Sequence, residues 1–304
     1  MEQCRIKTKP NYSRWLFIIS HLALGLFNVA LFYFYCNADS FVMAFQRKEK
    51  GVTYWTLNNF KYFFDSMFDQ SSVLFEAFKN TFMWFGVNVF LTVASMFVSY
   101  FLYKKVFGHQ FFKVAFFLPG LISPIVLAYC IEKMAGTQGF IAQMVQRIQH
   151  LDSVPELLVD SRYAIKTLMV KNIIFGLMGN FLIWCGTMSR IPDSVIESAK
   201  LDGVNWLQEM FLIVLPCIMP TVAISLCTML SSVFSANGGE FLYTKGENGT
   251  MTFSTWMYLQ IYETGIESNS HNVVSAIGWL ITIVTVPLVL LTRKISKFIG
   301  EVEY

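Results

Sequence analysis

Long apolar runs separated by short polar segments dominate the pattern of this chain. A helix needs about 20 mostly apolar residues to cross a bilayer. Six runs approach this length: residues 15–36, 80–103, 111–130, 172–189, 213–236 and 272–291. They predict an all-α polytopic membrane protein with six transmembrane helices. Residues 1–14 are then an N-terminal tail, and residues 15–304 form a single transmembrane domain. The fourth run can begin either at residue 172 or earlier, near Tyr163.

Polar residues inside these runs recur at helical spacing. In the fifth run Ser225, Thr228 and Ser232 follow one another by three or four residues, so they share one helix face. Polar faces avoid lipid and look into the helix bundle. Close helix packing through small residues explains such a face. The alternative is that part of it lines a path for a hydroxylated solute.

Charge is sparse and unevenly placed. Only 14% of the residues are charged, against about 25% in an ordinary soluble protein. Lys113 is the one charged residue inside the six runs, which argues against a proton relay at mid-depth. With a cytoplasmic N-terminus, 12 of the 23 Lys and Arg residues fall on the cytoplasmic side, in about half the chain length of the opposite side. This density difference predicts that both termini are cytoplasmic.

Metal chemistry has no signal in the sequence. The 6 cysteines form no C-x-x-C pair, and the 4 histidines are scattered without an H-E-x-x-H motif. We therefore expect no metal site. The chain also lacks the G-x-x-x-x-G-K-[ST] phosphate loop, so we expect it to hydrolyse no ATP itself.

Residues 190–212 form the most organised polar segment between two runs. Pro192 suits a first helical turn, and the following acidic residues lie at the positive end of the helix dipole. Asp202 and Gly203 then break the helix, because Gly can adopt a left-handed conformation. A second helix follows, and Pro216 marks its entry into the fifth run. The pattern predicts two helices joined by a tight turn on the cytoplasmic side.

The spacing inside this segment carries a family resemblance. Glu197, Ser198 and Ala199, then Gly203, then the I-x-L-P run ending at Pro216 match E-A-A, three residues, G, nine residues, I-x-L-P. This resembles the "EAA" cytoplasmic loop of ABC importer permeases, with Ser198 as the one departure in the triplet. The run "IPDSVIESAKLDGVNW" resembles the sugar branch of these permeases, which includes the maltose and glycerol-phosphate systems.

The resemblance extends over most of the chain. The stretches "FFLPGLISPIVLAY" and "VVSAIGWL" look like their counterparts in that branch. One loop departs: "TKGENGT" at Thr244–Thr250 stands where the family often has a Gly-Gly-Pro turn. The shape of this loop is therefore left open.

The resemblance implies a heteromeric importer in the cell membrane of a bacterium or archaeon. Its partners would be a second homologous permease, two cytoplasmic ATPases that hold ATP and Mg, and an extracellular or periplasmic solute-binding protein, with no nucleic acid among them. This chain would be a transport subunit without a cofactor of its own. Its 190–212 segment would be a coupling helix that docks on an ATPase through Glu197, Ser198, Ala199, Asp202, Gly203 and Pro216.

The solute follows from the resemblance only as a class. A sugar site combines hydrogen-bonding groups with aromatic faces, and Asn180 and Trp184 are four residues apart in the fourth run. Together with Ser225, Thr228 and Ser232 they are the predicted solute-path residues. Trp184 is also a plausible packing residue, whereas an unsatisfied amide at Asn180 would be costly in lipid. The loops carry no basic cluster that would favour a phosphate, so a sugar or oligosaccharide is the expected solute.

Three other classes of protein compete with this interpretation. A gradient-driven secondary carrier would show carboxylates inside the spans or an inverted repeat with broken helices. A membrane enzyme would need clustered His, Asp or Glu near an interface. A purely structural subunit would give no reason for the E-A-A spacing. The permease interpretation accounts for more of the sequence than any of them.

Overall fold

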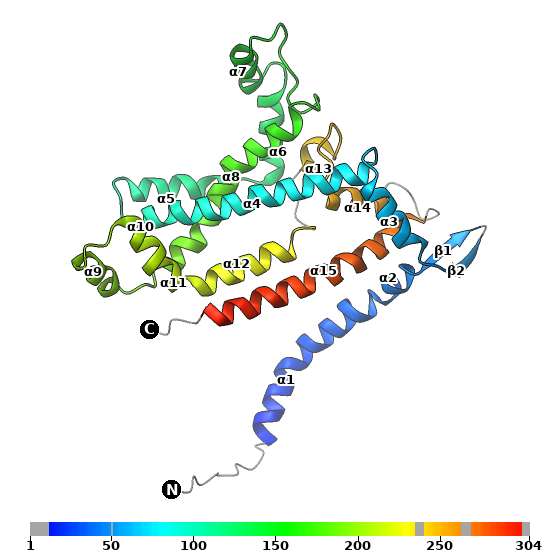
Figure 1. Cartoon of the computed structure of the whole chain (residues 1–304), viewed down its shortest axis with the longest axis horizontal. Coiled ribbons are helices and arrows are strands. Elements are labelled where there is room, and N and C mark those ends of the chain that lie inside the picture. Colours follow the sequence, from blue (N-terminus) through cyan, green and yellow to red (C-terminus); the bar gives the residue numbers. More distant parts are fainter. Residues whose placement is uncertain (1–11, 50, 235–239, 263–268, 300–304) are drawn as a thin grey trace.

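Figure 1 shows the computed structural model, which describes residues 12–49, 51–234, 240–262 and 269–299. The chain is mostly helical. Two long helices, α4 (Val73–Tyr103) and α15 (Ser270–Ile299), begin at the same end of the bundle, near a β-hairpin. The short helices α9 (Asp193–Leu201) and α10 (Trp206–Gln208) lie at the opposite end. These two ends are called the hairpin end and the α9 end.

The described residues contain four straight helices that are long and apolar enough to cross a membrane: Leu16–Met43, Val73–Tyr103, Ala164–Met188 and Ser270–Thr292. Two bent helix pairs raise the number of candidate spans in this part of the chain to six if each pair counts as one. The structure therefore agrees with a multi-pass helical membrane protein.

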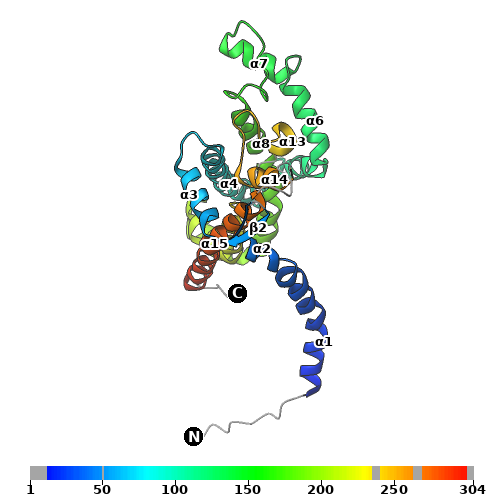
Figure 2. The same ribbon diagram turned by 90° about the vertical axis from the view of Figure 1, so that its right-hand side faces the viewer.

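The first span is longer than predicted. It combines α1 (Tyr12–Asn28), η1 (Val29–Tyr35) and α2 (Ala38–Met43), so it extends past residue 36. Asn37 sustains the continuation, because its amide donates hydrogen bonds to the carbonyl oxygens of Phe32 and Tyr33. This helix runs away from the rest of the bundle (Figure 2). Its apolar side chains are exposed within the chain, which suits contact with lipid.

Two of the predicted spans each contain a sharp bend, which the apolar runs alone do not indicate. The third consists of α5 (His109–Phe117), η2 (Leu118–Leu121) and α6 (Pro124–Ala135), with a bend of 96°. Pro119 and Pro124 lack the N–H that a continuous helix would use. The predicted run 111–130 therefore contains the bend, and its two parts lie in different helices.

The fifth span is bent by 76°. It comprises α10, η3 (Glu209–Val214), α11 (Leu215–Cys217) and α12 (Met219–Ser231). The break falls at Ile218, between the two helix-interrupting residues Pro216 and Pro220. α12 ends at Ser231, and residues 235 and 236 of the predicted span lie outside the described part.

α4 and α8 (Ala164–Met188) pack closely along their length. α4 begins earlier than residue 80, because Ser72 caps it by accepting a hydrogen bond from the N–H of Phe75 at 3.1 Å. α8 begins at Ala164, so the earlier of the two predicted starts of the fourth run, near Tyr163, is the correct one. Ser99 on α4 donates to the carbonyl oxygen of Phe181 on α8 at 2.9 Å, so a buried hydrogen bond joins the two spans.

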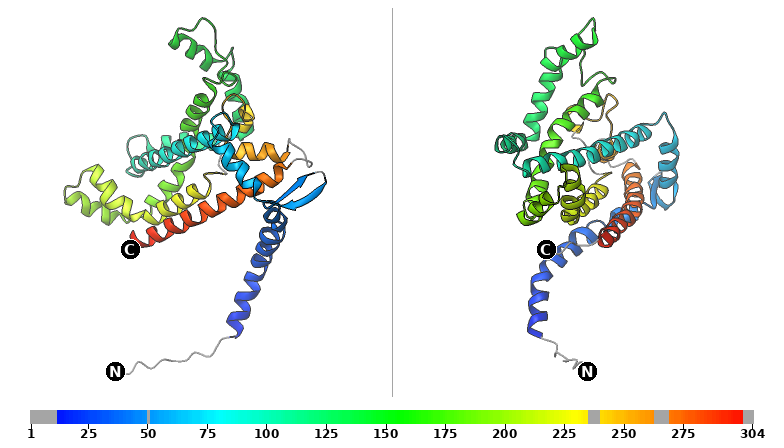
Figure 3. Two further views of the ribbon diagram at one scale, coloured as in Figure 1. Left: turned by 45° about the vertical axis from the view of Figure 1, so that its right-hand side comes forward. Right: turned by 60° about the vertical axis from the view of Figure 1, so that its left-hand side comes forward.

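The β-hairpin is the one departure from an all-helical fold in the described chain. β1 (Gln46–Glu49) pairs antiparallel with β2 (Val52–Trp55), as seen in Figure 3. Three asparagine side chains hold β1 from outside the hairpin. Asn59, on α3 (Asn58–Phe68), donates to the carbonyl oxygens of Ala44 and Gln46, Asn269 bonds both backbone groups of Lys48, and Asn272 donates to Gln46.

The 244–253 loop is fastened to the first turns of α4. It lies between α13 (Glu240–Thr244) and α14 (Phe253–Tyr262). The amide of Asn80 donates to the carbonyl oxygens of Gly249 at 3.0 Å and Met251 at 2.9 Å. The hydroxyl of Thr81 accepts from the N–H of Phe253 at 2.9 Å. The loop turns tightly at four residues with positive φ: Lys245, Gly246, Asn248 and Gly249.

Gly139 is followed by the amphipathic helix α7 (Phe140–Gln149), whose apolar residues Phe140, Met144 and Ile148 recur every four positions. It projects from the bundle at the end of α6 (Figure 2). Ala142 packs into a small buried cluster with Leu157 and Leu168. The apolar residues Phe140 and Ile148 face outward, so α7 is anchored by one side only.

Candidate functional site

Residues 190–212, called the coupling segment below after the role that the sequence resemblance implies for it, form two helices joined by a tight turn, as the sequence predicted. Pro192 precedes α9 as its N-cap with an extended backbone, one position before the first helical turn. Asp193 then lies in the first turn and Lys200 in the last, which places each charge favourably in the helix dipole. The segment lies between α8 and the bent fifth span (Figure 1).

The turn after α9 has the hydrogen bonds of a Schellman motif. The N–H of Val204 donates to the carbonyl oxygen of Ala199 at 3.2 Å, and the N–H of Gly203 donates to that of Lys200 at 3.1 Å. Gly203 has φ +72°, a conformation that strains other residues. The predicted requirement for glycine at this position is therefore explained by the backbone.

A capping box starts the second helix of the segment. The side chain of Asn205 accepts from the N–H of Gln208 at 2.9 Å, and the side chain of Gln208 accepts from the N–H of Asn205 at 3.0 Å. The helix then continues as η3 and α11 to the bend at Ile218. The two helices of the segment are thus joined through defined caps rather than a loose loop.

The predicted docking residues divide between surface and interior. Glu197, Ser198, Asp202 and Gly203 are exposed, whereas Ala199 is buried. Within the described chain Glu197 forms no ion pair. Leu201, which the sequence did not single out, is 89% exposed beside them. α9 therefore presents acidic groups and one large apolar side chain on the surface. Pro216 is half-buried further along the segment's second helix.

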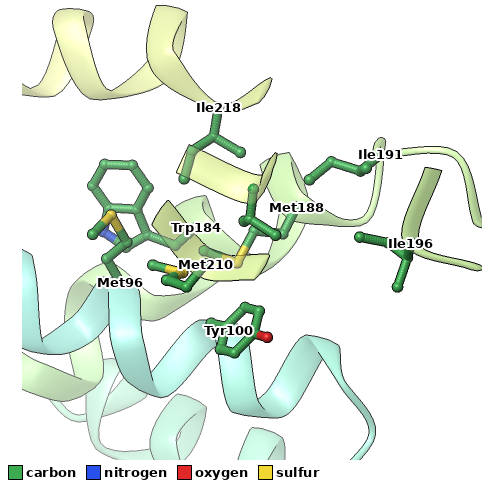
Figure 4. Packing of buried hydrophobic residues seen from close by; sticks show 9 residues of the cluster. Met96, Tyr100, Trp184, Met188, Ile191, Ile196, Met210 and Ile218 are labelled. Carbon is green, nitrogen blue, oxygen red and sulfur yellow. The ribbon is translucent and has the colours of Figure 1, made fainter. Parts of the chain in front are cut away.

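A buried cluster connects the coupling segment to three spans (Figure 4). Its members come from α4, α8, α9, the turn before α9, and the bent fifth span. They are Met96, Tyr100, Trp184, Met188, Ile191, Ile196, Met210, Val214 and Ile218. Close-packed interiors transmit displacement, so movement of α9 would be passed to its neighbours.

One ion pair lies beside this cluster. The Nζ atom of Lys104, at the end of α4, is 2.7 Å from each carboxylate oxygen of Glu209. Only 4% of the Glu209 side chain is exposed, against 24% for Lys104. The hydroxyl of Tyr100 donates to the carbonyl oxygen of Trp206 at 3.3 Å in the same region.

The predicted solute-path residues do not gather at one point. Trp184 is 2% exposed inside the buried cluster. On α12 the hydroxyl of Thr228 donates to the carbonyl oxygen of Ile224, and that of Ser232 to Met229. Ser225 is half-buried on the same helix. Asn180 belongs to α8, but its side chain lies outside the described part of the structure.

Ser232 lines a small polar pocket between α4 and α12. The pocket has a volume of about 20 Å³, enough for about one water molecule. Its α4 side contains Thr81, Trp84 and Asn88. The Nε1 atom of Trp84 is buried and has no hydrogen-bond partner, although buried donors are rarely left unpaired. Asn88 accepts a hydrogen bond from Asn172 at 3.4 Å.

Metal ligands are not clustered in the described part of the chain. No group of three or more His, Cys, Asp or Glu side chains there is placed to hold an ion.

Comparison with known protein families assigns the chain to a family. Residues 172–300 match the sequence model of the "Binding-protein-dependent transport system inner membrane component" family. This range contains the whole coupling segment, α8 from residue 172 onwards and the bent fifth span. The chain is an ABC importer permease. The family is the membrane component of the transporter, so this subunit is not the ATPase.

Relatives resemble the permease over most of its length. It is 26% identical to the arabinooligosaccharides transport system permease protein AraP of Halalkalibacterium halodurans, over 88% of this chain and 81% of that one. It is 22% identical to the multiple sugar-binding transport system permease protein MsmF of Streptococcus mutans, over 96% and 97% of the two chains. The permease is thus a multi-pass cell-membrane protein with bacterial relatives.

Solved structures share the fold of the permease. A chain in the crystal structure of a bacterial ABC transporter that imports the acidic polysaccharide alginate matches it with a TM-score of 0.76 and 21% identity. The match covers 95% of this permease and 98% of that chain. A second alginate transporter structure, in complex with an alginate pentasaccharide-bound periplasmic protein, gives a TM-score of 0.74.

Sequence reasoning missed two features of the permease. The ion pair of Lys104 and Glu209 joins positions far apart in the chain, and the one available signal was a carboxylate directly before the apolar run "MFLIVL". The pocket residue Trp84 was missed because its role depends on α12 packing against α4. Neither arrangement leaves a local pattern.

Proposed function

We propose that this permease is one of two homologous membrane subunits of an ATP-driven importer for a sugar or oligosaccharide. The observation that carries the proposal is the coupling segment, with its Schellman turn and capping box, inside the region that matches the family. The names of its relatives support the solute class, because AraP and MsmF are described as sugar transport permeases. Two cytoplasmic ATPases, which bind ATP and Mg, and a solute-binding protein complete the proposed complex.

In the proposed topology both bent helix pairs are counted as spans, which gives six spans with both termini in the cytoplasm. The α9 end is then cytoplasmic, and the β-hairpin and 244–253 loop face outward. Lys104, Lys105, Arg190 and Lys200 lie towards the α9 end, and the excess of positive charge on the cytoplasmic side supports this orientation.

The proposed coupling mechanism uses α9 as a lever. Glu197, Ser198 and Asp202 lie on the exposed surface for an ATPase cleft, while Ala199 packs inward and Gly203 makes the turn. Closure of the ATPase dimer would displace α9. The second helix of the segment, which continues through Pro216 into the fifth span, would then shift the balance between inward-facing and outward-facing states.

The proposed solute path runs beside α12. Ser225, Thr228 and Ser232 supply hydroxyls, and the pocket at Ser232 is also lined by Trp84, whose indole N–H has no hydrogen-bond partner among the described residues. Asn180 remains part of the proposal from its position on α8. Trp184 packs inside the buried cluster. Its proposed contribution to the solute path is therefore to hold the neighbouring helices in place.

Affinity purification of the tagged chain from native membranes, followed by mass spectrometry, tests the proposal. We expect a second permease and an ATPase to accompany the chain, and the ligand of the associated binding protein to name the solute. Gly203→Pro is the matched disruption, because proline cannot adopt φ +72°. A chain that purifies alone, with uptake intact in this variant, would contradict the proposal and favour a gradient-driven carrier.

A further inference from the structure

The coupling segment is fused to the fifth span, but its contact with the second span, α4, is made by side chains. Lys104 is the C-cap residue of α4, and Glu209 follows the capped turn of α10. The two Nζ–carboxylate distances of 2.7 Å make this contact bidentate. Charge-assisted hydrogen bonds of this kind are short and geometrically specific.

This ion pair differs from the others in the described chain. Arg47 with Glu49, and Asp160 with Arg162, each join residues two positions apart and have an exposed partner. In the second pair, the hydrogen bond from Arg162 lowers the pKa of Asp160. Lys104 and Glu209 instead connect two elements that are 105 positions apart, with the carboxylate almost fully buried.

Neighbouring contacts fix the same two elements. Tyr100, one turn before Lys104, is fully buried and donates to the carbonyl oxygen of Trp206. The rings of Phe101 and Trp206 lie 5.5 Å apart. Because removal of one partner would leave a buried charge uncompensated, the end of α4 and the start of the segment's second helix are expected to move together.

We propose that the Lys104–Glu209 ion pair is the joint through which displacement of the coupling segment reaches α4. The inference rests on the proposed coupling function and adds a second route to it. The fifth span receives the displacement through its own backbone, and α4 receives it through this pair. Lys104 and Glu209 are positioning residues, since neither contacts ATP or solute.

The test compares two reporter cysteines that line the same pocket from opposite helices. Phe85 on α4 and Met229 on α12 are both half-buried in its wall. Phe85→Cys and Met229→Cys are made separately in a chain whose 6 native cysteines are serine. The assembled transporter is treated with N-ethylmaleimide, with and without Mg-ATP and vanadate, and the two labelling rates are compared.

With the ion pair intact, we expect nucleotide to change the labelling rate at both reporters. In Glu209→Gln and Lys104→Met, the change at Met229→Cys persists, while the change at Phe85→Cys falls about fivefold or more. The charge-reversed pair, Lys104→Glu with Glu209→Lys, restores the response of Phe85→Cys. Asp160→Asn, which breaks an exposed pair elsewhere, leaves both responses unchanged.

Each contrary result has its own meaning. An unchanged response of Phe85→Cys in both single variants overturns the joint while leaving the proposed function standing. If neither reporter responds in the intact transporter, the coupling function itself fails. If the single variants do not assemble, restoration of assembly by charge reversal without restoration of the Phe85→Cys response also overturns the joint.

Discussion

The N–H of Val204 donates a hydrogen bond to the carbonyl oxygen of Ala199, and this bond closes the turn that ends α9. Ala199 is buried beneath the exposed Glu197 and Ser198. The backbone of the turn therefore determines how the exposed residues are presented. Substitutions in the turn and on the surface should have separable effects.

Gly203→Ala should weaken attachment of the ATPase. A Cβ at φ +72° meets no neighbouring atom, so the cost is backbone strain of about 1 kcal/mol. Gly51→Ala is the matched control, because Gly51 has φ +81° and equally open surroundings in the hairpin. Thermal unfolding should shift similarly in both variants, and only Gly203→Ala should lose co-purifying ATPase. Equal ATPase recovery would contradict the prediction.

Glu197→Ala should lower affinity for the ATPase without lowering the stability of the permease. The side chain is exposed and forms no ion pair in the described chain. Loss of one charged contact at an interface should reduce affinity about tenfold. Binding of the purified ATPase to the permease in nanodiscs measures this. Glu132→Ala, an exposed acidic position on α6, serves as control, and an equal loss there would show a nonspecific charge effect.

Asn80→Ala should destabilise the hairpin end of the permease. The amide of Asn80 is buried and donates to two carbonyl oxygens of the 244–253 loop. Leaving them unpaired should cost about 2 kcal/mol. Proteolysis of this loop and the unfolding temperature report the effect. Asn58→Ala, at an exposed position, should change neither; a loop equally protected in both variants would refute the role of Asn80.

Trp84→Phe tests the polar pocket beside α12. The substitution keeps a large ring and removes an indole N–H that has no hydrogen-bond partner in the described structure. The unfolding temperature should therefore change little. If the N–H donates to a solute hydroxyl, KM for the solute named by the binding protein should rise about fivefold, in line with loss of one neutral hydrogen bond. An unchanged KM would show that this N–H does not bind the solute and would favour an ordered water as its hydrogen-bond partner.

Features set by neighbouring residues were predictable from the sequence. The turn at Gly203 follows from helix-capping chemistry, and α7 follows from the spacing of Phe140, Met144 and Ile148. The existence of the spans follows from apolar runs. The identities of the docking residues Glu197 and Asp202 remain predictions, because the structure contains no ATPase.

Features set by distant residues were not predictable. The bends between Leu121 and Pro124 and at Ile218 were not predicted, because the average apolarity of a run does not show where a backbone N–H is lacking. The β-hairpin is held in part by Asn269 and Asn272, more than 200 positions away in sequence. The pairing of Lys104 with Glu209 likewise depends on how two spans pack.

The 96° bend in the third span has a consequence for how the cell must make this protein. At the bend, Leu118, Leu121 and Ile122 are exposed next to a backbone that no longer forms a continuous helix. Lipid tails cannot satisfy such backbone groups. In the proposed complex the second permease would cover them, so a copy of this chain synthesised without that partner would keep these backbone groups exposed to lipid. If the proposed pair of permeases is correct, balanced production of the two subunits would keep unassembled copies from accumulating in the membrane.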